Sequence, residues 1–473
     1  MIGYGIGSLG QGLTYGFMST YFVVFLTNSV GLSSSLATTI SALALLVEVL
    51  AGMIIGNISD RCTSKMGKRR PFMMAAGLAV FPIFLFLFRS LTDETALRTI
   101  YYLVFAILFR TFFSSWEIPN QALGAELVST YDGRTKLRTI TRYFSVVGNG
   151  TGYIMPLLVL EAFGDNVQAG WWTIGILTGA ISAVSWLTSV VVNKGKGEYL
   201  KPEDLPEKTA KGIVVVKEIL KSYSELIKLK VGKLLVGYKA AFTCAYAFYN
   251  VATIYFMTYS LGLSNKVTSY MYYITVAVYI VVTPLVNKMA LRVGKVNQQL
   301  FSMALSGGVG VLVFIINPQS FVGVALYVAA FSYMTTSFWQ VSSAIFYDVI
   351  EVDEWVNFKR REGDLVSMVS VLGTMISAIM VQAFGILMDK TGFDAALTAQ
   401  PEHVVPFLNV SFILIPSVCL LIGAFVLKLF PINKKTFASL CSALEKRRNG
   451  EDYSEEMDDV NYILGKKQAE KEL

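Results

Sequence analysis

The amino-acid sequence contains about a dozen apolar stretches of roughly twenty residues each, spread along nearly the whole chain. A stretch of that length crosses the roughly 30 Å of hydrocarbon in a bilayer as one helix. A helix satisfies its own backbone hydrogen bonds without water, and the alternation expected of a β-barrel is missing. The pattern predicts an all-α membrane protein with twelve transmembrane helices. The predicted spans are residues 4–28, 36–57, 72–90, 98–123, 137–161, 170–192, 234–260, 267–288, 297–316, 320–345, 364–388 and 404–429.

Composition supports a membrane protein and excludes several other classes. Charged residues make up only 15% of the chain, against about 25% in soluble domains. The net charge of +7 is spread over short loops, so we expect no nucleic-acid partner. Four scattered cysteines and one histidine, His403, give no metal-ligand spacing. HExxH and GxSxG signatures are also missing, so we expect no metal, no cofactor and no enzymatic activity.

Lysine and arginine alternate between the loops in a regular way. The basic loops include residues 61–70, 134–138 and 359–361, whereas the opposite loops 28–35 and 317–320 contain neither residue. Cytoplasmic loops carry the excess of positive charge, so both termini are predicted to be cytoplasmic. We expect a multi-pass protein of the plasma (cytoplasmic) membrane.

The spans divide six and six around a basic middle segment. Such duplication is typical of secondary transporters, whose halves move about a central site. The predicted parts are an N-terminal six-helix bundle (1–193), a cytoplasmic middle loop (194–233), a pseudo-symmetric C-terminal six-helix bundle (234–430) and a cytoplasmic tail (431–473). Within the middle loop, 212–229 has helical character; the tail reads as a short helix over 436–446 followed by an acidic, disordered segment.

Six spans carry polar residues at helical spacing, which places those residues on one face of each helix. Lipid cannot satisfy such groups, so they face either one another or a wet cavity. Interhelical hydrogen bonds worth about 0.6 kcal/mol each are the alternative to a cavity. Hydroxyl, amide and indole groups beside a few charges suit a polyhydroxylated solute. The faces are Ser8, Gln11, Tyr15 and Ser19; Arg110, Ser114, Glu117 and Gln121; Arg142, Ser145, Asn149 and Tyr153; Lys239, Thr243, Tyr246 and Asn250; Thr336, Trp339 and Ser343; and Ser370, Thr374 and Ser377.

The charged residues within the spans have separate interpretations, because ionisable groups in a membrane are costly and usually functional. Glu48 lies too deep to reach the surface, so we expect a coupling-ion or proton site there, with a structural ion pair as the alternative. Glu117 is expected to contact the solute, and Arg110 could pair with either acid. Arg142 and Lys239 lie nearer the membrane surface, where the side chain can extend to the headgroups; for Lys239 that interpretation is favoured.

Several motifs resemble the glycoside–pentoside–hexuronide:cation symporter family, a branch of the major facilitator superfamily. They are the opening IGYGIG at 2–7, DRCTSKMGKRRP at 60–71, WEIPN at 116–120, and YDVIEVDEW at 347–355 followed by KRREG at 359–363. Their order and spacing extend the resemblance over nearly the whole chain up to the tail. It implies a twelve-helix major facilitator fold, alternating access and cation-coupled uptake of a glycoside, pentoside or hexuronide.

The resemblance also assigns individual roles. Glu117 occupies the position of a family sugar-binding acid, and Arg142 that of an arginine at the sugar site. Trp339 falls on an aromatic residue near the sugar, and Glu48 on one of two aspartates that bind the cation. Combined with the polar faces, this gives the predicted substrate-binding set of Gln11, Tyr15, Arg110, Glu117, Arg142, Asn149, Asn250, Trp339 and Thr374.

Departures from the family pattern affect the prediction of the coupling ion. Gly52 replaces the second cation-site acid, and Leu45 an arginine three residues before the first. Gly12 replaces the acidic sugar contact of helix one, and Thr374 a lysine of helix eleven. One glutamate makes a poor sodium cage, whereas a lone carboxylate removed from water favours its protonated form. We therefore expect H⁺ coupling over Na⁺. The cationic side chains make an anionic sugar such as a uronide a candidate substrate.

Two charged clusters are predicted to form a cytoplasmic gate. The clusters are Asp60, Arg61, Arg69 and Arg70 after the second span, and Asp348 and Glu351 in the predicted loop 348–362. Pairing across the two halves would hold one state until solute binds. The alternative is topological anchoring alone.

Three functions are compatible with the sequence: a sugar:cation symporter, a transporter of lysolipids or other amphiphiles, and a non-transporting sensor or scaffold. An amphiphile transporter would want an apolar lateral cleft, and a sensor a soluble output domain; neither long loop is large enough for one. The expected partners are a small sugar and the lipid bilayer, with the protein working as a monomer.

Overall fold

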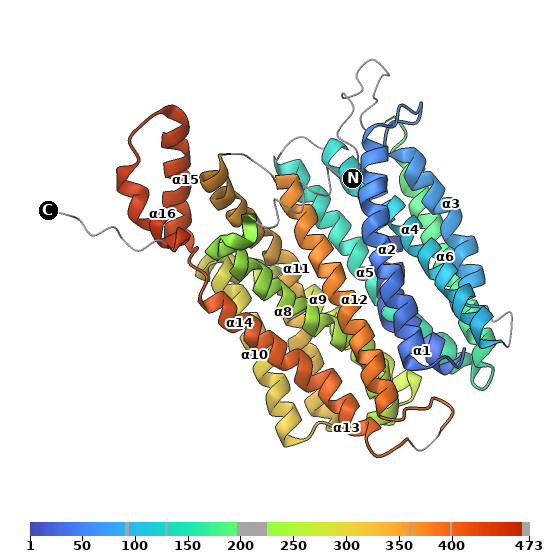
Figure 1. Cartoon of the computed structure of the whole chain (residues 1–473). Helices are drawn as coiled ribbons and strands as arrows, with labels where there is room; N and C mark the ends of the chain where they lie inside the picture. The colour runs from blue at the N-terminus through green and yellow to red at the C-terminus, as the bar shows by residue number, and fades with distance from the viewer. Residues whose placement is uncertain (90–93, 128–130, 196–224, 359–361, 398–399, 466–473) are drawn as a thin grey trace. The chain divides into compact units, whose positions relative to one another are not determined.

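The computed structural model describes all residues except 90–93, 128–130, 196–224, 359–361, 398–399 and 466–473. Its regular structure is helical throughout the described residues, as Figure 1 shows. The first half contains α1 (Ile2–Asn28), α2 (Ser34–Asp60), α3 (Arg70–Leu87), α4 (Thr95–Leu127), α5 (Tyr131–Phe163) and α6 (Val167–Val192). The second half contains α8 (Lys230–Tyr255, continued by a π-helical turn Phe256–Ser260), α9 (Asn265–Val293), α10 (Lys295–Ile316), α11 (Phe321–Asn357), α12 (Glu362–Lys390), and α13 (Val404–Asn409) joined to α14 (Ile415–Lys428) through a π-helical turn (Val410–Leu414).

These helices match the predicted spans one for one. Eleven are long and apolar enough to cross a membrane. The twelfth, α1, is 27 residues long but less apolar, because it contains six glycines and several hydroxyl and amide side chains. For the part of the chain that the structure describes, the all-α architecture with twelve long helical spans is confirmed.

One boundary differs clearly from the prediction. Helix α11 continues to Asn357, twelve residues beyond the predicted end of its span, so most of the predicted loop 348–362 is helical. Val349, Ile350 and Val352 remain buried in this extension, and this packing sustains the helix past the apolar run. It ends where Phe358 adopts a left-handed conformation with φ of 57°.

The tail is more ordered than predicted. It forms α15 (Lys434–Asn449), a short 3₁₀ turn (Ser454–Glu456) and α16 (Met457–Leu464), so the expected disorder after residue 446 is wrong for the described residues up to 465. A capping box between Asn433 and Thr436 begins α15. Val460 and Ile463 form a buried apolar face on α16, which outweighs the acidic composition of its sequence.

The chain divides into two compact units. Unit 1 comprises residues 1–209, 247–276 and 377–412, and unit 2 comprises 210–246, 277–376 and 413–473. Unit 1 therefore contains the first six helices, end segments of α8, α9 and α12, and the whole of α13. The division into bundles at 1–193 and 234–430 stays a prediction. Most of the middle loop 194–233, including the start of the predicted helix 212–229, lies outside the described residues.

Within unit 1, α1 and α5 approach through glycines on both helices. A Cβ atom at Gly148 would lie 2.1 Å from the carbonyl oxygen of Leu9, and one at Gly12 would lie 2.4 Å from that of Ser145. Small residues permit such backbone contact between membrane helices. The contact brings Asn149, from the polar face of α5, beside Gly16 of α1.

This contact gives a stability prediction. Gly148→Ala should lower the apparent melting temperature of the purified protein by several degrees, because overpacking a backbone contact costs about 1–3 kcal/mol. Gly56→Ala is the matched control, since its new Cβ would meet only Ile118 at an ordinary 3.7 Å. Thermal unfolding in detergent measures both. Equal melting temperatures for the two variants would contradict the α1–α5 packing.

Candidate functional site

Helix α1 leaves one stripe of its surface accessible. From Gln11 to Thr27 every residue is buried except Gln11, Tyr15 and Ser19, which recur every four residues. This stripe belongs to the face that the sequence analysis identified as polar. A lipid-facing stripe would be apolar, so the partial accessibility of these residues indicates a polar space beside α1.

Gln11 and Glu117 come together at this stripe. The Gln11 Nε2 donates a hydrogen bond of 3.1 Å to Glu117 Oε1, and the Gln121 Nε2 donates one of 3.3 Å to the same oxygen. Glu117 and Gln121 are one turn apart on α4. The carboxylate is therefore held by two amide donors from two helices.

Glu48 has a cationic partner. The Arg110 Nη1 lies 2.8 Å from Glu48 Oε2, and the Ser114 hydroxyl donates to the Glu48 backbone carbonyl at 3.1 Å. Both charged side chains are mostly buried, with 9% of Arg110 and 19% of Glu48 exposed. Of the two partners left open for Arg110, the structure shows Glu48. The expectation that Glu48 is a lone carboxylate is wrong, so its burial alone does not favour proton coupling.

The three charges form one electrostatic cluster. Glu48 repels a second negative charge on Glu117, whereas Arg110 attracts it. With one guanidinium shared by two carboxylates, the cluster carries one excess negative charge when both acids are ionised. A bound cation or a single proton would neutralise it.

Helix α5 supplies polar atoms that lack partners among the described residues. The Nε of Arg142 is buried and has no hydrogen-bond partner, and neither has Oδ1 of Asn149. The Nδ2 of Asn149 donates 3.0 Å to the Ser145 carbonyl. Buried polar groups are nearly always hydrogen-bonded, so one donor and one acceptor here remain available to water or a solute.

The remaining predicted binding residues are divided between the two units. Tyr15 and Asn250 belong to unit 1 and both make further interactions. In unit 2, the Thr374 hydroxyl donates to the Ser370 carbonyl at 3.1 Å. Thr336 is fully buried and bonds the carbonyl of Ser332, so it does not continue the accessible face of α11.

Trp339 stands at the edge of an aromatic cluster in unit 2. Half of its surface is exposed, and it meets the rings of Phe242 and Tyr246 edge-on at 6.1 and 6.4 Å. Phe242 stacks on Phe338, which fixes α8 against α11. An exposed indole held in this way offers a flat face to a ligand.

Asp60 and Arg69 of the predicted gate form an ion pair inside unit 1. Arg69 lies 2.5 Å from Asp60 and 3.1 Å from Glu126, and it also donates to the Ser59 hydroxyl at 2.8 Å. Arg70 donates to the carbonyl of Val190 at 3.1 Å. These contacts join α2, α3, α4 and α6. Pairing of this cluster across the two halves stays a prediction.

Arg61 lies one residue beyond α2, at its C-cap, and it makes a further interaction.

The second predicted gate cluster lies inside unit 2. The Asp348 carboxylate is 2.6 Å from the ammonium of Lys295 at the start of α10.

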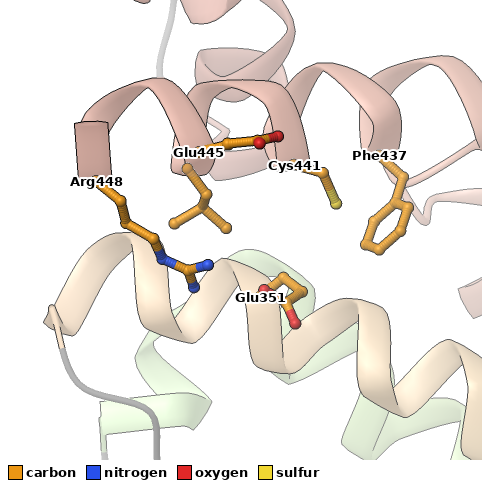
Figure 2. Close-up of a pocket in the computed structure, with 6 residues that line it drawn as sticks. Glu351, Phe437, Cys441, Glu445 and Arg448 are labelled. Atoms are coloured by element: carbon orange, nitrogen blue, oxygen red, sulfur yellow. The ribbon is translucent and has the colours of Figure 1, made fainter. Parts of the chain in front are cut away.

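Glu351 lines a cavity of about 360 Å³ between α11 and α15. Figure 2 shows Phe437, Cys441 and Arg448 of α15 pointing towards α11, which carries Glu351. Burial raises the pKa of the Cys441 thiol, and the carboxylates of Glu351 and Asp348 raise it further. Both effects disfavour the thiolate form of this cysteine.

The tail also binds the end of α11. The Arg447 guanidinium lies 4.3 Å from the Trp355 ring centre and 4.4 Å from that of Phe358. It donates to the backbone carbonyls of Trp355, at 2.8 Å, and Glu354, at 3.4 Å. Carbonyls in the last turn of a helix have no partner within it, so this arginine caps α11.

Sequence reasoning missed a set of contacts at the other end of unit 1, which we call the outer contacts. Asp389 accepts hydrogen bonds from the backbone N–H groups of Ser34 (2.8 Å) and Ser35 (2.9 Å). The hydroxyls of Thr27 and Tyr255 lie 2.6 Å apart. These contacts, and the stacked pair of Tyr153 and Tyr272, join helices of the first half to helices of the second. An acid near the end of a predicted span, Asp389, is the signal that the sequence offers for these contacts, but nothing in the sequence identifies its partner.

Comparison with known proteins gives a consistent result. Residues 3–434 match the family described as MFS/sugar transport protein. The chain is 22% identical over 447 residues to an isoprimeverose transporter from Lactiplantibacillus pentosus, covering 91% of this chain and 88% of that protein. It is 29% identical to an uncharacterized symporter from Synechocystis, but that match spans only 42% of this chain and 38% of the symporter.

Solved structures show the same fold. A crystal structure of a D-xylose-proton symporter superimposes with a TM-score of 0.62 at 16% identity, covering 90% of this chain and 95% of that one. A proton-dependent oligopeptide transporter gives a TM-score of 0.64 at 11% identity, covering 90% and 98%. At these identities the likeness concerns the fold alone, and it confirms the predicted major facilitator architecture.

Proposed function

Because the chain belongs to the MFS/sugar transport protein family, we propose that it is a plasma-membrane symporter that imports a glycoside, pentoside or hexuronide with a cation. The accessible polar stripe of α1 carries this proposal. Gln11, Tyr15 and Ser19 would be costly facing lipid and useful facing a hydroxylated solute. An amphiphile transporter would be expected to leave an apolar stripe accessible at this position.

The groups around the stripe match the chemistry of a sugar. A sugar hydroxyl both donates and accepts hydrogen bonds. Glu117 accepts from hydroxyls as a carboxylate, Arg142 Nε donates, and Asn149 Oδ1 accepts. In this proposal the sugar forms the hydrogen bonds that Arg142 Nε and Asn149 Oδ1 lack. Because both atoms are already buried, their desolvation adds no further cost to the free energy of binding.

The coupling cation acts, in our proposal, on the cluster of Glu48, Arg110 and Glu117. Glu48 is already neutralised by Arg110, so Glu117 is the acid that gains or loses charge. Gln11 and Gln121 point N–H donors at its carboxylate, whereas a sodium ion needs oxygen lone pairs. A proton has no such requirement. We therefore favour H⁺ over Na⁺, now on the geometry around Glu117.

Alternating access requires the outer contacts to break when the site opens to the outside. Asp389 is the central element, because its carboxylate lies at the N-terminus of α2, where the helix dipole favours negative charge. Thr38 is fully buried nearby, where its hydroxyl fills the place that a Cβ on Gly385 would take.

Asp389→Asn should therefore weaken outer closure. Its expected effects are slower sugar uptake and several-fold faster labelling of a cysteine placed at Thr38 by a membrane-impermeant maleimide. Asp165→Asn, a change of an exposed acid between α5 and α6, is the control. Unchanged labelling in Asp389→Asn would show that this contact does not close the protein.

Uptake into proteoliposomes tests the proposed function. The purified protein is screened against radiolabelled glycosides, pentosides and hexuronides, with an inward proton gradient or an inward sodium gradient. We expect at least one sugar to accumulate under the proton gradient and to be lost when an uncoupler is added. Accumulation that needs Na⁺ and ignores the uncoupler would overturn proton coupling, and no sugar uptake at all would overturn the transport function.

A further inference from the structure

Lys239 is a cation inside a membrane helix whose surroundings in unit 2 are aromatic. Its ammonium lies 5.3 Å from the ring centre of Phe346 and 6.0 Å from that of Phe338, both on α11. The side chain is half-buried. The sequence alone favoured extension of this side chain to the membrane surface, and the geometry points elsewhere.

The position of the ammonium along α11 is well inside the helix. Tyr238, the preceding residue, hydrogen-bonds Ser342 at 3.0 Å. Ser342 lies fifteen residues before Asn357, the last residue of α11, which is about 22 Å along the axis. The ammonium lies between the rings of Phe338 and Phe346, next to the end of the predicted span 320–345.

The burial of α8 also limits the contact that Lys239 can make with lipid. In the most apolar part of α8, 72% of residues are buried, so most of the surface of this helix packs against other parts of the chain. On so enclosed a helix, the accessible part of Lys239 fits an interior space better than a lipid-facing position. Charged residues within membrane spans usually face such a space.

No carboxylate neutralises this cation among the described residues of unit 2. Among the residues that the structure describes, no ion pair within 4.0 Å involves the Lys239 ammonium. Asp348 lies only two residues beyond Phe346 on α11, but it is bound to Lys295 at 2.6 Å. Aromatic faces stabilise a cation only partly. The ammonium therefore retains an unmet demand for an anion.

An aromatic wall lies beside the ammonium. Trp339 follows Phe338 directly in sequence and is half exposed, and Phe242 of α8 contacts both rings. A flat apolar surface with one cation at its edge fits a sugar ring that carries a single anionic group. The ring stacks on the indole, and the anion pairs with the ammonium.

We propose that Lys239 is a specificity-determining binding residue, which selects sugars bearing one anionic group, a carboxylate or a phosphate, over their neutral counterparts. This inference rests on the proposed sugar transport and names the substrate class within it. Displacing water from a cation costs free energy that a neutral hydroxyl recovers poorly and a carboxylate recovers well. Selection against neutral sugars follows from the same cost.

Binding to the purified full-length protein tests the inference. Titration calorimetry compares matched pairs that differ only at C6: glucose with glucuronate, galactose with galacturonate, and mannose with mannuronate. The corresponding 6-phosphates distinguish a carboxylate from a phosphate as the anion. The variants are Lys239→Met and Lys239→Arg, and the control is Lys233→Met, at an exposed lysine near the start of the same helix.

The wild type should bind the acidic member of at least one pair tenfold or more tightly than the neutral member. Lys239→Met should lose that preference, and Lys239→Arg and Lys233→Met should keep it. Without ligand, Lys239→Met should melt no lower than wild type, because it removes an uncompensated charge, so loss of binding is distinguishable from misfolding.

Two results overturn the inference. Neutral sugars bound as tightly as their acids, or an acid preference that survives in Lys239→Met, would remove Lys239 from substrate selection while leaving sugar transport standing. A wild type that binds none of the sugars, neutral or acidic, would overturn the proposed function and the inference with it.

Discussion

Replacing Glu117 with glutamine is expected to lower sugar binding at least tenfold and to abolish accumulation against a gradient. The carboxylate accepts hydrogen bonds from Gln11 and Gln121, and in the proposed mechanism also from the sugar. A hydrogen bond to a charged group is worth about 1.5–3 kcal/mol, roughly 10- to 150-fold in affinity. Glutamine keeps the shape but cannot take up a proton, so coupling should be lost together with affinity.

Calorimetry gives the affinity of Glu117→Gln, and proteoliposomes give accumulation. Glu402→Gln, a change at an exposed acid between α12 and α13, should leave both unchanged. Undiminished sugar binding in Glu117→Gln would remove the residue from the site. Retained accumulation would remove it from coupling.

Arg110→Met is expected to be the most destabilising single change in the cluster. It leaves the Glu48 carboxylate, 19% exposed, without its cation. Removing one partner of a buried ion pair costs about 3–5 kcal/mol, whereas removing both is often neutral. The double variant Glu48→Gln with Arg110→Met should therefore recover most of the lost stability. It should not recover coupled transport, because the charge that attracts Glu117 is gone.

Thermal unfolding of the wild type, both single variants and the double variant measures the coupling between the two residues. If the two single changes simply add in the double variant, Glu48 and Arg110 do not form the ion pair seen in the structure. Recovery of both stability and proton-coupled uptake would show that the pair is structural only.

Features that depend on local periodicity could be predicted from the sequence. The twelve long helices follow from apolar length, and the polar face of α1 from the spacing of Gln11, Tyr15 and Ser19. Whether such a face is buried against another helix or left accessible is shown by the burial of its residues, which the sequence does not reveal. The extension of α11 to Asn357 could not be predicted from apolar length, because its last turns are charged and lie beyond the apolar run.

Contacts between distant parts of the chain could not be predicted. Nothing in the local sequence distinguishes Glu48 from Glu117 as the partner of Arg110, because either carboxylate would neutralise the guanidinium. The contact of Asp389 with Ser34 joins residues 355 positions apart. Helix α16 was missed for a different reason, because its acidic composition hides a short apolar face that is stable only against α15.

The glycine at position 12 shows how packing explains a departure from the family pattern. The family's acidic contact in helix one falls on Gly12, where even a Cβ would lie 2.4 Å from the Ser145 carbonyl. An acid at this position is therefore incompatible with the close approach of α1 and α5. At Gly52 the new Cβ would lie 2.8 Å from the flexible end of Ile118 and 4.0 Å from the Ser114 hydroxyl oxygen, so a Cβ there requires only a small shift of that Ile118 methyl group.

Cysteine accessibility along α1 tests the central claim most directly, namely that its polar stripe lines a water-filled sugar site. In a background without Cys62, Cys244, Cys419 and Cys441, single cysteines replace Gln11, Tyr15, Ser19 and, as a buried control, Leu13. We predict that a hydrophilic maleimide labels the three stripe positions, that Leu13→Cys stays unlabelled, and that a transported sugar slows the labelling. Stripe cysteines that react only with a lipid-soluble reagent, or with neither reagent, would contradict the account.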